Sequence, residues 1–353
     1  MTKTLTKRAL GDSGLDISPL VFGGNVFGWT ADEATSFSLL DAFVDAGFDA
    51  IDTADAYSRW VDGHSGGESE TIIGKWLKAR GRRGEVKILT KVGSDMGQGH
   101  KDLSPAWIEK AVEDSLRRLQ TDHIDLYQTH WFDPETPQEE MLRALDRLVT
   151  SGKVGAIGTS NHTAEQVADA LAISEREGLA AYRSVQPHYN LYSRDTFEGP
   201  LQDLAVEKGL GVITYFSLES GFLTGKYKTA DQIVGTNRQG MLEGKFDERG
   251  VRILAVLDAV AQKNEATSAQ VALAWLLAQP GVTAPIVSAT STAQLADTLK
   301  AATLELSDED VAGRVTPMGE AEVRVIGGEP GRERTFRVIG LLPAGSINRL
   351  WVT

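Results

Sequence analysis

The segment AFVDAGFDAIDTADAY, residues 42–57, contains the repeating unit from which the fold can be predicted. Its first five residues end a stretch with helical spacing, and Gly47 follows as a helix stop. FDAID is then typical of a short buried strand, and a polar loop with Asp55 and Tyr57 comes directly after Asp52. A helix, a glycine, a strand and a polar loop in this order indicate an alternating α/β protein.

The same alternation continues along the chain. Longer segments with apolar residues at helical spacing separate the strand-like runs, and several of them begin on Ser, Thr or Pro and end on Gly, as capped helices do. At the N-terminus, TKRAL and LDISP flank the turn residues GDSG and predict a small hairpin. The eight β-rich runs are LVFGG, FDAIDT, VKILTK, HIDLYQTH, VGAIGTS, YRSVQPHY, GVITYFS and TAPIVSA.

Eight such units predict a (β/α)₈ TIM barrel of the α/β class. The alternative is a doubly wound open sheet, which calls for a G-x-G-x-x-G fingerprint after its first strand, whereas GGNVFG follows here. Two regions depart from the pattern: a long loop at 219–250 that is followed by an extra helix, and the end of the chain. We therefore expect a barrel domain over 1–312 and an atypical tail over 313–353 of unknown structure. The tail's Arg- and Gly-rich composition fits both a native extension and an out-of-frame end.

Composition excludes several classes of function. The 353 residues include 36 Lys plus Arg and 49 Asp plus Glu, a net charge of −13 that argues against nucleic acid and anionic membrane as partners. The chain has no cysteine, so disulfides, thiol nucleophiles and cysteine metal sites are excluded. No run approaches the roughly 20 apolar residues of a membrane span, and the N-terminus lacks the apolar region of a signal peptide. These features predict a cytoplasmic protein.

Three familiar site motifs are absent or out of context. GHSGG at 63–67 matches G-x-S-x-G, but the polar loop SRWVDG precedes it where a nucleophile elbow needs a strand. There is no G-x-x-x-x-G-K-[ST] phosphate loop. The six histidines never occur at i, i+4 on one helix, so no metal site is predicted.

Polar side chains gather where the predicted strands end, which is where barrel enzymes place their chemistry. Asp52, Lys91 and His130 end the second, third and fourth strands, and Tyr57 lies just beyond Asp52. Taken singly, Asp52 could be a cap for the next segment, Lys91 a solvated strand end and His130 a core imidazole. Together they indicate proton transfer, because a lysine lowers the pKa of a nearby phenol from about 10, an aspartate can hold that lysine, and a histidine can donate to a substrate oxygen.

At these positions the chain resembles the aldo-keto reductases. The resemblance covers residues 5 to 311 and rests on DTADAY, LTKVG, YQTHWFD, SGKVGAIGTSN, VQPHYN and SGFLTGK, in this order on the expected elements. It implies an NAD(P)(H)-dependent oxidoreductase that transfers hydride between the nicotinamide and an aldehyde, a ketone or the corresponding alcohol. It also implies a catalytic tetrad of Asp52, Tyr57, Lys91 and His130, with Tyr57 as general acid and base. Asp55 stays outside this tetrad, and the family pattern and the spacing both allow it a backbone or helix-capping role.

The resemblance also implies where the cofactor binds. NADP(H) is the family default, but no basic residue occurs from Pro285 to Thr298, where the family usually grips the 2′-phosphate, and Thr298 replaces the usual Asn. NAD(H) is therefore possible, unless Lys226 or Arg238 supplies the missing charge. Tyr215 matches the residue stacked under the nicotinamide, with core packing as the alternative. The expected cofactor-binding residues are Ser160, Asn161, Gln186, Tyr215, Leu218, Ser220, Leu223, Lys226, Ser288, Thr290 and Gln294.

The substrate side is less specific. The resemblance leads us to expect a small-molecule carbonyl or alcohol, and leaves the oligomeric state open. A second class of function is a cofactor-sensing regulatory subunit with little turnover, like the potassium-channel β subunits that share this fold. Four aromatic residues on or near loops at the open end predict an apolar substrate pocket, unless they only pack: Trp29, Trp60, Trp131 and Phe132.

Overall fold

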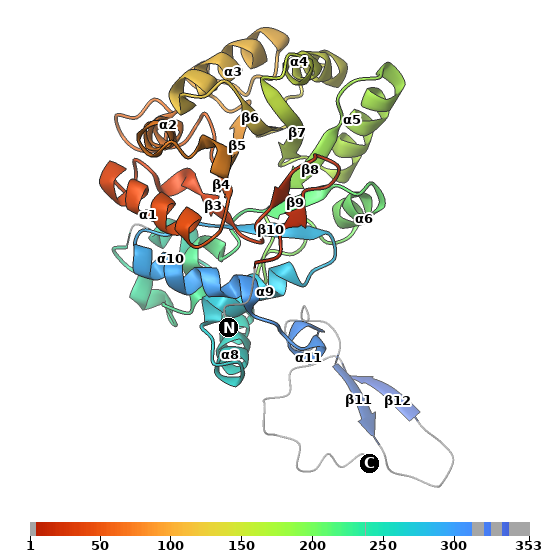
Figure 1. Ribbon diagram of the computed structural model, residues 1–353. Helices are drawn as coiled ribbons and strands as arrows, with labels where there is room; N and C mark the ends of the chain where they lie inside the picture. The colour runs from red at the N-terminus through yellow and green to blue at the C-terminus, as the bar shows by residue number, and fades with distance from the viewer. Residues whose placement is uncertain (1–4, 237, 313–320, 326–333, 339–353) are drawn as a thin grey trace.

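The computed structural model describes residues 5–236, 238–312, 321–325 and 334–338. Eight parallel strands form a closed barrel in the order β10-β3-β4-β5-β6-β7-β8-β9, which confirms the predicted (β/α)₈ fold (Figure 1). The strands are β3 (Val21–Gly23), β4 (Ala50–Asp52), β5 (Lys87–Val92), β6 (Ile124–Thr129), β7 (Val154–Ser160), β8 (Tyr182–Gln186), β9 (Gly211–Thr214) and β10 (Val282–Val287).

Helices follow the strands and surround the barrel (Figure 1). Their ends carry the expected caps: Thr163 and Gln166 form a capping box, and Gly178 ends the same helix in a left-handed conformation. The main helices are α1 (Glu33–Asp45), α2 (Glu68–Arg80), α3 (Pro105–Leu119), α4 (Gln138–Thr150), α5 (Ala164–Glu177), α6 (Pro200–Glu207), α8 (Glu248–Lys263), α9 (Ser268–Leu277) and α10 (Thr292–Leu299).

The predicted N-terminal hairpin packs against one end of the barrel. Its strands β1 (Arg8–Ala9) and β2 (Asp16–Ile17) pair antiparallel. Leu10 and Ile17 are fully buried in one cluster with inward-facing residues of the barrel strands, among them Leu89. A Cβ at Gly211 would lie 2.5 Å from Leu10 Cδ1, so glycine is needed there for this close approach. The hairpin seals this end, and the opposite end carries the polar strand termini.

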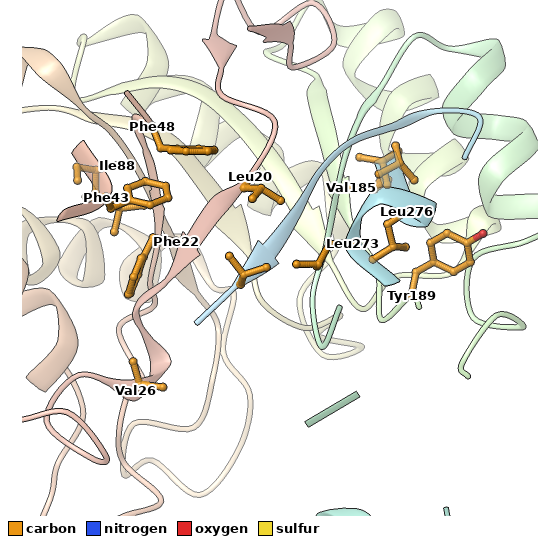
Figure 2. Close-up of a cluster of buried hydrophobic side chains, with 14 of the residues drawn as sticks. Leu20, Phe22, Val26, Phe43, Phe48, Ile88, Val185, Tyr189, Leu273 and Leu276 are labelled. Carbon is orange, nitrogen blue, oxygen red and sulfur yellow. The ribbon is translucent and has the colours of Figure 1, made fainter. Parts of the chain in front are cut away.

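A larger apolar core lies between the barrel and its helices (Figure 2). Phe22 and Ile88 project outward from the strands and, with Phe43 of α1 and Leu273 of α9, are fully buried in it. Each such side chain contributes roughly 1.5–3 kcal/mol relative to an exposed one. The barrel wall is therefore rigid, and the side chains at its open end are held by fixed strands.

Short helical turns occupy the long loop after β9 that the sequence singled out. They are η3 (Glu219–Thr224), η4 (Ala230–Ile233) and α7 (Gln239–Leu242), and the extra helix predicted after the loop is α8. Beyond α11 (Asp308–Ala312), the described part of the tail is an antiparallel pair, β11 (Ala321–Val325) and β12 (Arg334–Val338). The rest of the tail lies outside the described residues. None of the helices in the described ranges combines the length and apolar character that crossing a membrane requires.

Candidate active site

A buried ion pair lies inside the barrel where β4 and β5 end. The Lys91 Nζ atom donates to Asp52 Oδ2 (2.6 Å), to the Thr53 carbonyl (2.8 Å) and to the Tyr57 hydroxyl (3.1 Å). Lys91 is fully buried, and Asp52 is 2% exposed. An ammonium group has three N–H donors, so all three are used. Although burial lowers the pKa of Lys91, Asp52 and Tyr57 outweigh it and raise that pKa, so the ammonium stays charged.

The loop that carries Tyr57 is fastened at both of its ends. Near the strand, the Tyr57 N–H donates to the Ala54 carbonyl in a turn. Beyond it, the Glu68 carboxylate at the start of α2 accepts from the Ser58 N–H (3.0 Å) and the Ser65 N–H (2.9 Å). This acidic residue in the first helical turn also suits the helix dipole. The loop therefore places the phenol beside Lys91 with little freedom.

The pKa of Tyr57 differs from the sequence-based expectation, in which Lys91 lowers it. Burial raises the pKa of this phenol above its ordinary value of about 10, and the lowering by Lys91 is smaller than that increase. The physical reason is desolvation, because a phenolate loses its hydration in this site. Tyr57 is therefore a protonated phenol at neutral pH, with a cation already in place for the phenolate.

The imidazole of His130, directly after β6, faces the same phenol. Its ring centroid lies 5.9 Å from that of Tyr57, and its Nδ1 atom is hydrogen-bonded to the Ser94 hydroxyl at 2.9 Å. Burial first, and then the charges of Lys91 and Lys101, lower the pKa of His130 well below its usual range. The ring is thus neutral. When Ser94 donates to Nδ1, the ring proton is on Nε2, where it can be donated to a substrate oxygen.

The other oxygen of Asp52 links the ion pair to two of the expected cofactor-binding residues. Gln186 Nε2 donates to Asp52 Oδ1 at 2.8 Å, and the Ser160 hydroxyl donates to the Gln186 carbonyl at 2.8 Å. Gln186 and Ser160 are each 2% exposed. The two residues end β8 and β7, so neighbouring strand ends bring them to the ion pair. Gln186 therefore contacts the ion pair directly, and Ser160 is linked to it only through the main chain of Gln186.

Tyr215 has one ring face covered by protein. The ring of His188 stacks on it at 5.3 Å between centroids and 25° between planes. The Tyr215 hydroxyl donates to Asn161 Oδ1 (2.7 Å), and Asn161 Nδ2 donates to the His130 carbonyl (2.9 Å). A cavity of about 480 Å³ is lined by Asn161, Gln186 and Tyr215, among others. The volume is in the range of small-molecule sites, but Asp52, Tyr57, Lys91 and His130 are not among the residues that line this cavity.

The loop after β9 contains both buried apolar side chains and polar side chains. Leu223 is fully buried, whereas Leu218 is only partly buried. The Ser220 carbonyl accepts from Arg238 Nη1 at 2.7 Å, and Lys226 is exposed with its ammonium 5.1 Å from the Tyr227 ring. Within 5–236 and 238–312, Arg238 forms no ion pair, so its charge remains uncompensated beside Ser220.

The start of α10 is rich in hydroxyl groups that already have partners. The Ser288 hydroxyl lies 2.7 Å from the Gly23 carbonyl, and Ser291 caps the helix by accepting from the Gln294 N–H. The Gln294 side-chain oxygen in turn accepts from the Thr290 N–H at 3.0 Å. Together they make a well-formed helix N-terminus, which favours anions without any positive side chain.

Three of the four aromatic residues expected in the pocket form a row of ring contacts with Tyr57 and His130 of the tetrad. Trp60 lies 5.8 Å from Trp29 and 5.5 Å from Tyr57, and Trp131 stacks on His130 at 5.6 Å. Trp60 is 50% exposed and Trp131 36% exposed, so these large apolar rings face solvent. Phe132 instead contacts His162 at 5.5 Å and does not join this row. The row forms an aromatic wall on both sides of the phenol.

Several residues of this site were not found from the sequence. Ser94 and His188 act only through contacts with His130 and Tyr215, and no motif marks such partners. Asp55, for which the sequence allowed a backbone or helix-capping role, is buried; the Ala56 backbone N–H lowers its pKa by hydrogen bonding, and no side chain of the described residues donates to it. Glu219 is buried beside His188, and its only signal in the sequence was its place in the long loop.

Comparison with known proteins is consistent with this arrangement. The model of the Aldo/keto reductase family matches residues 19–314. An uncharacterized oxidoreductase of Bacillus subtilis (strain 168), YrpG, is 38% identical over 307 residues, which are 85% of this chain and 92% of that protein. Aldo-keto reductase YhdN of the same organism is 34% identical over 81% of this chain and 86% of its own length. A probable voltage-gated potassium channel subunit beta of Arabidopsis thaliana is 31% identical over 93% and 98%, respectively.

Proposed function

This chain belongs to the aldo-keto reductase family of oxidoreductases, and we propose that it reduces small carbonyl compounds with a nicotinamide cofactor and with Tyr57 as general acid. The observation that carries the proposal is the position of Lys91 Nζ, which donates to the Asp52 carboxylate and to the Tyr57 hydroxyl at the same time. When bound, the cofactor would supply the hydride in reduction or accept it in alcohol oxidation.

Tyr57 gives its proton to the substrate oxygen. A phenol of ordinary pKa, about 10, already carries its proton at neutral pH, and burial raises this pKa further. The phenolate that remains lies 3.1 Å from the Lys91 ammonium, whose charge stabilises it. Asp52 holds the ammonium at 2.6 Å and balances its charge. In the direction of alcohol oxidation the same phenolate is the base.

His130 orients and polarises the substrate oxygen. Its neutral ring can donate from Nε2 while Ser94 holds Nδ1 at 2.9 Å. A neutral donor beside Lys91 is preferable to an imidazolium, because a second cation there would be repelled. Hydrogen bonds that strengthen as charge develops on an oxygen stabilise the transition state selectively.

The residues present fit a nicotinamide dinucleotide. The exposed face of Tyr215, with Asn161 and Gln186 beside it, would hold the nicotinamide. The uncompensated guanidinium of Arg238 and the N-terminus of α10 suit the phosphates. Because Arg238 and Lys226 are cationic groups on this loop, we propose NADP(H) as the preferred cofactor, with NAD(H) accepted more weakly.

The substrate class follows from the aromatic wall. Trp29, Trp60 and Trp131 offer apolar surface beside the phenol, two of them substantially exposed. Such rings favour a carbonyl compound with an apolar or aromatic body over a small polar one.

The test is Tyr57→Phe, assayed by carbonyl-dependent NADPH oxidation and by cofactor fluorescence titration. We expect turnover to fall by about 10² or more, the usual contribution of a general acid, with unchanged cofactor affinity. Tyr127→Phe is the matched control, because the Tyr127 hydroxyl has no hydrogen-bond partner among the described residues. Retention of more than about a tenth of wild-type turnover would refute the role of Tyr57. Tight cofactor binding by the wild type without turnover on any carbonyl or alcohol would favour a cofactor-sensing subunit instead.

A further inference from the structure

Glu219, at the start of η3, is a buried carboxylate that the proposed chemistry does not use. It is 3% exposed, and its Oε2 atom lies 2.9 Å from His188 Nε2 and accepts from the Ser193 hydroxyl at 3.1 Å. Asn190 Nδ2 also donates to it, and Lys245 Nζ pairs with Oε1. Although burial favours the neutral acid, these partners hold the pKa of Glu219 at about 2. The side chain is therefore always charged.

The partners of Glu219 lead directly to the expected nicotinamide site. His188, which contacts the carboxylate, stacks on Tyr215. Tyr215 donates to Asn161, and Asn161 donates to the carbonyl of His130. A continuous series of contacts thus runs from Glu219 to the proposed catalytic residues. A shift of the carboxylate would move the ring on which Tyr215 rests.

The backbone around Glu219 needs support. Phe216, Glu219 and Ser220 have φ values of 49°, 47° and 55°, in the left-handed region that costs non-glycine residues roughly 1–3 kcal/mol each. Asn190 Nδ2 donates to the Phe216 carbonyl at 2.9 Å as well as to Glu219. The same amide therefore holds two ends of the strained turn. The conformation of this turn sets the position of Ser220, which the family resemblance places near the cofactor pyrophosphate.

Glu219 also fixes the far end of the long loop. Lys245, which pairs with it, follows α7 and places its ammonium 4.7 Å from the Tyr192 ring. Next to it, Phe246 packs on Phe222 of η3 at 5.2 Å. The Glu219–Lys245 pair and the Phe246–Phe222 contact thus join the two ends of the loop, and Lys245 also contacts the β8–α6 connection at Tyr192.

We propose that Glu219 is a positioning residue for cofactor binding, which fixes the Tyr215 ring through His188 and the phosphate-facing turn through Asn190 and Lys245. This inference rests on the proposed function. A buried charge with several donors is expensive to place and gains nothing for a barrel core, so a role in holding the cofactor surface explains it better than general stability.

The test is Glu219→Gln, which keeps the shape and removes the charge. We expect the Kd for NADPH to rise roughly 10- to 100-fold, the range for losing charge-assisted hydrogen bonds, with KM for the carbonyl substrate changed less than about threefold. Lys245→Met removes one partner at the edge of the cluster and should raise that Kd by a smaller factor. The matched control is Lys228→Met: Lys228 lies on the same long loop, its pair with Asp258 of α8 is exposed, and Glu219 takes no part in that pair. Its Kd should stay within about twofold of wild type.

A fragment separates positioning from a loss of folding. Adenosine 2′-monophosphate has neither nicotinamide nor pyrophosphate, so Glu219→Gln should bind it as the wild type does. Equal losses of affinity for this fragment and for NADPH, together with a lower Tm, would overturn the inference in favour of a purely structural role. Wild-type NADPH affinity in Glu219→Gln and Lys245→Met would also overturn it and leave the proposed function intact. Failure of the wild type itself to bind NADPH or NADH would reject the proposed function and this inference together.

Discussion

Two aspartates only three positions apart have opposite surroundings. Asp52 is 2% exposed inside the barrel, where Lys91 and Gln186 donate to its two oxygens. Asp55 is 1% exposed, yet no side chain of the described residues donates to its oxygens, and the backbone N–H of Ala56 lowers its pKa only in part. Burial, and next the negative charge of Glu70, raise the pKa of Asp55 to about 8. Two equally buried carboxyl groups therefore differ in their partners: Asp52 has an ammonium at 2.6 Å, whereas Asp55 has no cationic side chain of the described residues bonded to it and is protonated at neutral pH.

The guanidinium that could pair with Asp55, that of Arg118, is already bound to the carboxylate of Glu70. Arg118 of α3 donates to Glu70 Oε2 at 2.7 Å, and the Thr90 hydroxyl donates to Glu70 Oε1 at 2.6 Å. One guanidinium thus serves the cluster of Asp55 and Glu70. Thr90 and Lys91 are consecutive on β5 and project to opposite sides of the barrel wall, which separates the outer cluster from the inner ion pair. Neighbouring residues therefore belong to sites with different chemistry.

The largest effect is expected from breaking the inner pair with Lys91→Met. The Asp52 carboxylate would stay buried without its cation, which typically lowers the free energy of unfolding by about 3–5 kcal/mol. Turnover should fall by about 10² or more, because Tyr57 loses its electrostatic partner. Urea unfolding and NADPH oxidation measure the two effects. The double variant Asp52→Asn/Lys91→Met should regain stability but not turnover, and a single variant as stable as the wild type would contradict the comparison.

A pH-dependent effect is expected at the outer cluster. The pKa of Asp55 is about 8 in the folded protein and about 4 in an unfolded chain, so between these values only the unfolded chain releases the proton. The stability contributed by the protonated acid is complete below about pH 4 and is lost as the pH rises towards about 8. Asp55→Asn cannot ionise. As the pH increases from about 4 to about 8, the free energy of unfolding of this variant should therefore rise by a few kcal/mol relative to that of the wild type. Parallel pH profiles of the free energy of unfolding would show that Asp55 has its ordinary pKa.

The smallest effect is expected from Tyr127→Phe, at an unpartnered polar group near Asp55. Burial raises the pKa of Tyr127 well above its usual range, and its hydroxyl forms no hydrogen bond with any residue that the structure describes. Removal of the Tyr127 hydroxyl should raise the free energy of unfolding by less than about 1 kcal/mol. Tyr182→Phe is the control, because the Tyr182 hydroxyl lies 3.1 Å from the Thr129 hydroxyl and its loss should destabilise by about 1 kcal/mol. Equal destabilisation in both variants would reveal a partner of Tyr127.

Much of the site was predictable because its residues share one geometric property. Asp52, Lys91 and His130 end or follow consecutive parallel strands, and such ends converge in a closed barrel. Lys91 lowers the pKa of Tyr57 as predicted, but desolvation, which depends on every atom packed around the phenol, outweighs it and raises the pKa. Phe132 lies at a rim position like Trp131, yet its ring contacts His162, since side-chain direction in a loop follows no period.

The order of strands and helices, the barrel, and the strand ends at which polar residues meet were all predictable from the sequence alone. These follow from hydrophobic periodicity and helix caps, which act over a few residues. Which cation pairs with which buried acid, in contrast, depends on how the folded chain brings distant residues together. Lys91 reaches Asp52 across 39 positions, and Gln186 reaches it across 134. Hydrogen bonds and desolvation depend on distances in space, and no local pattern of residues encodes the partner on a distant strand.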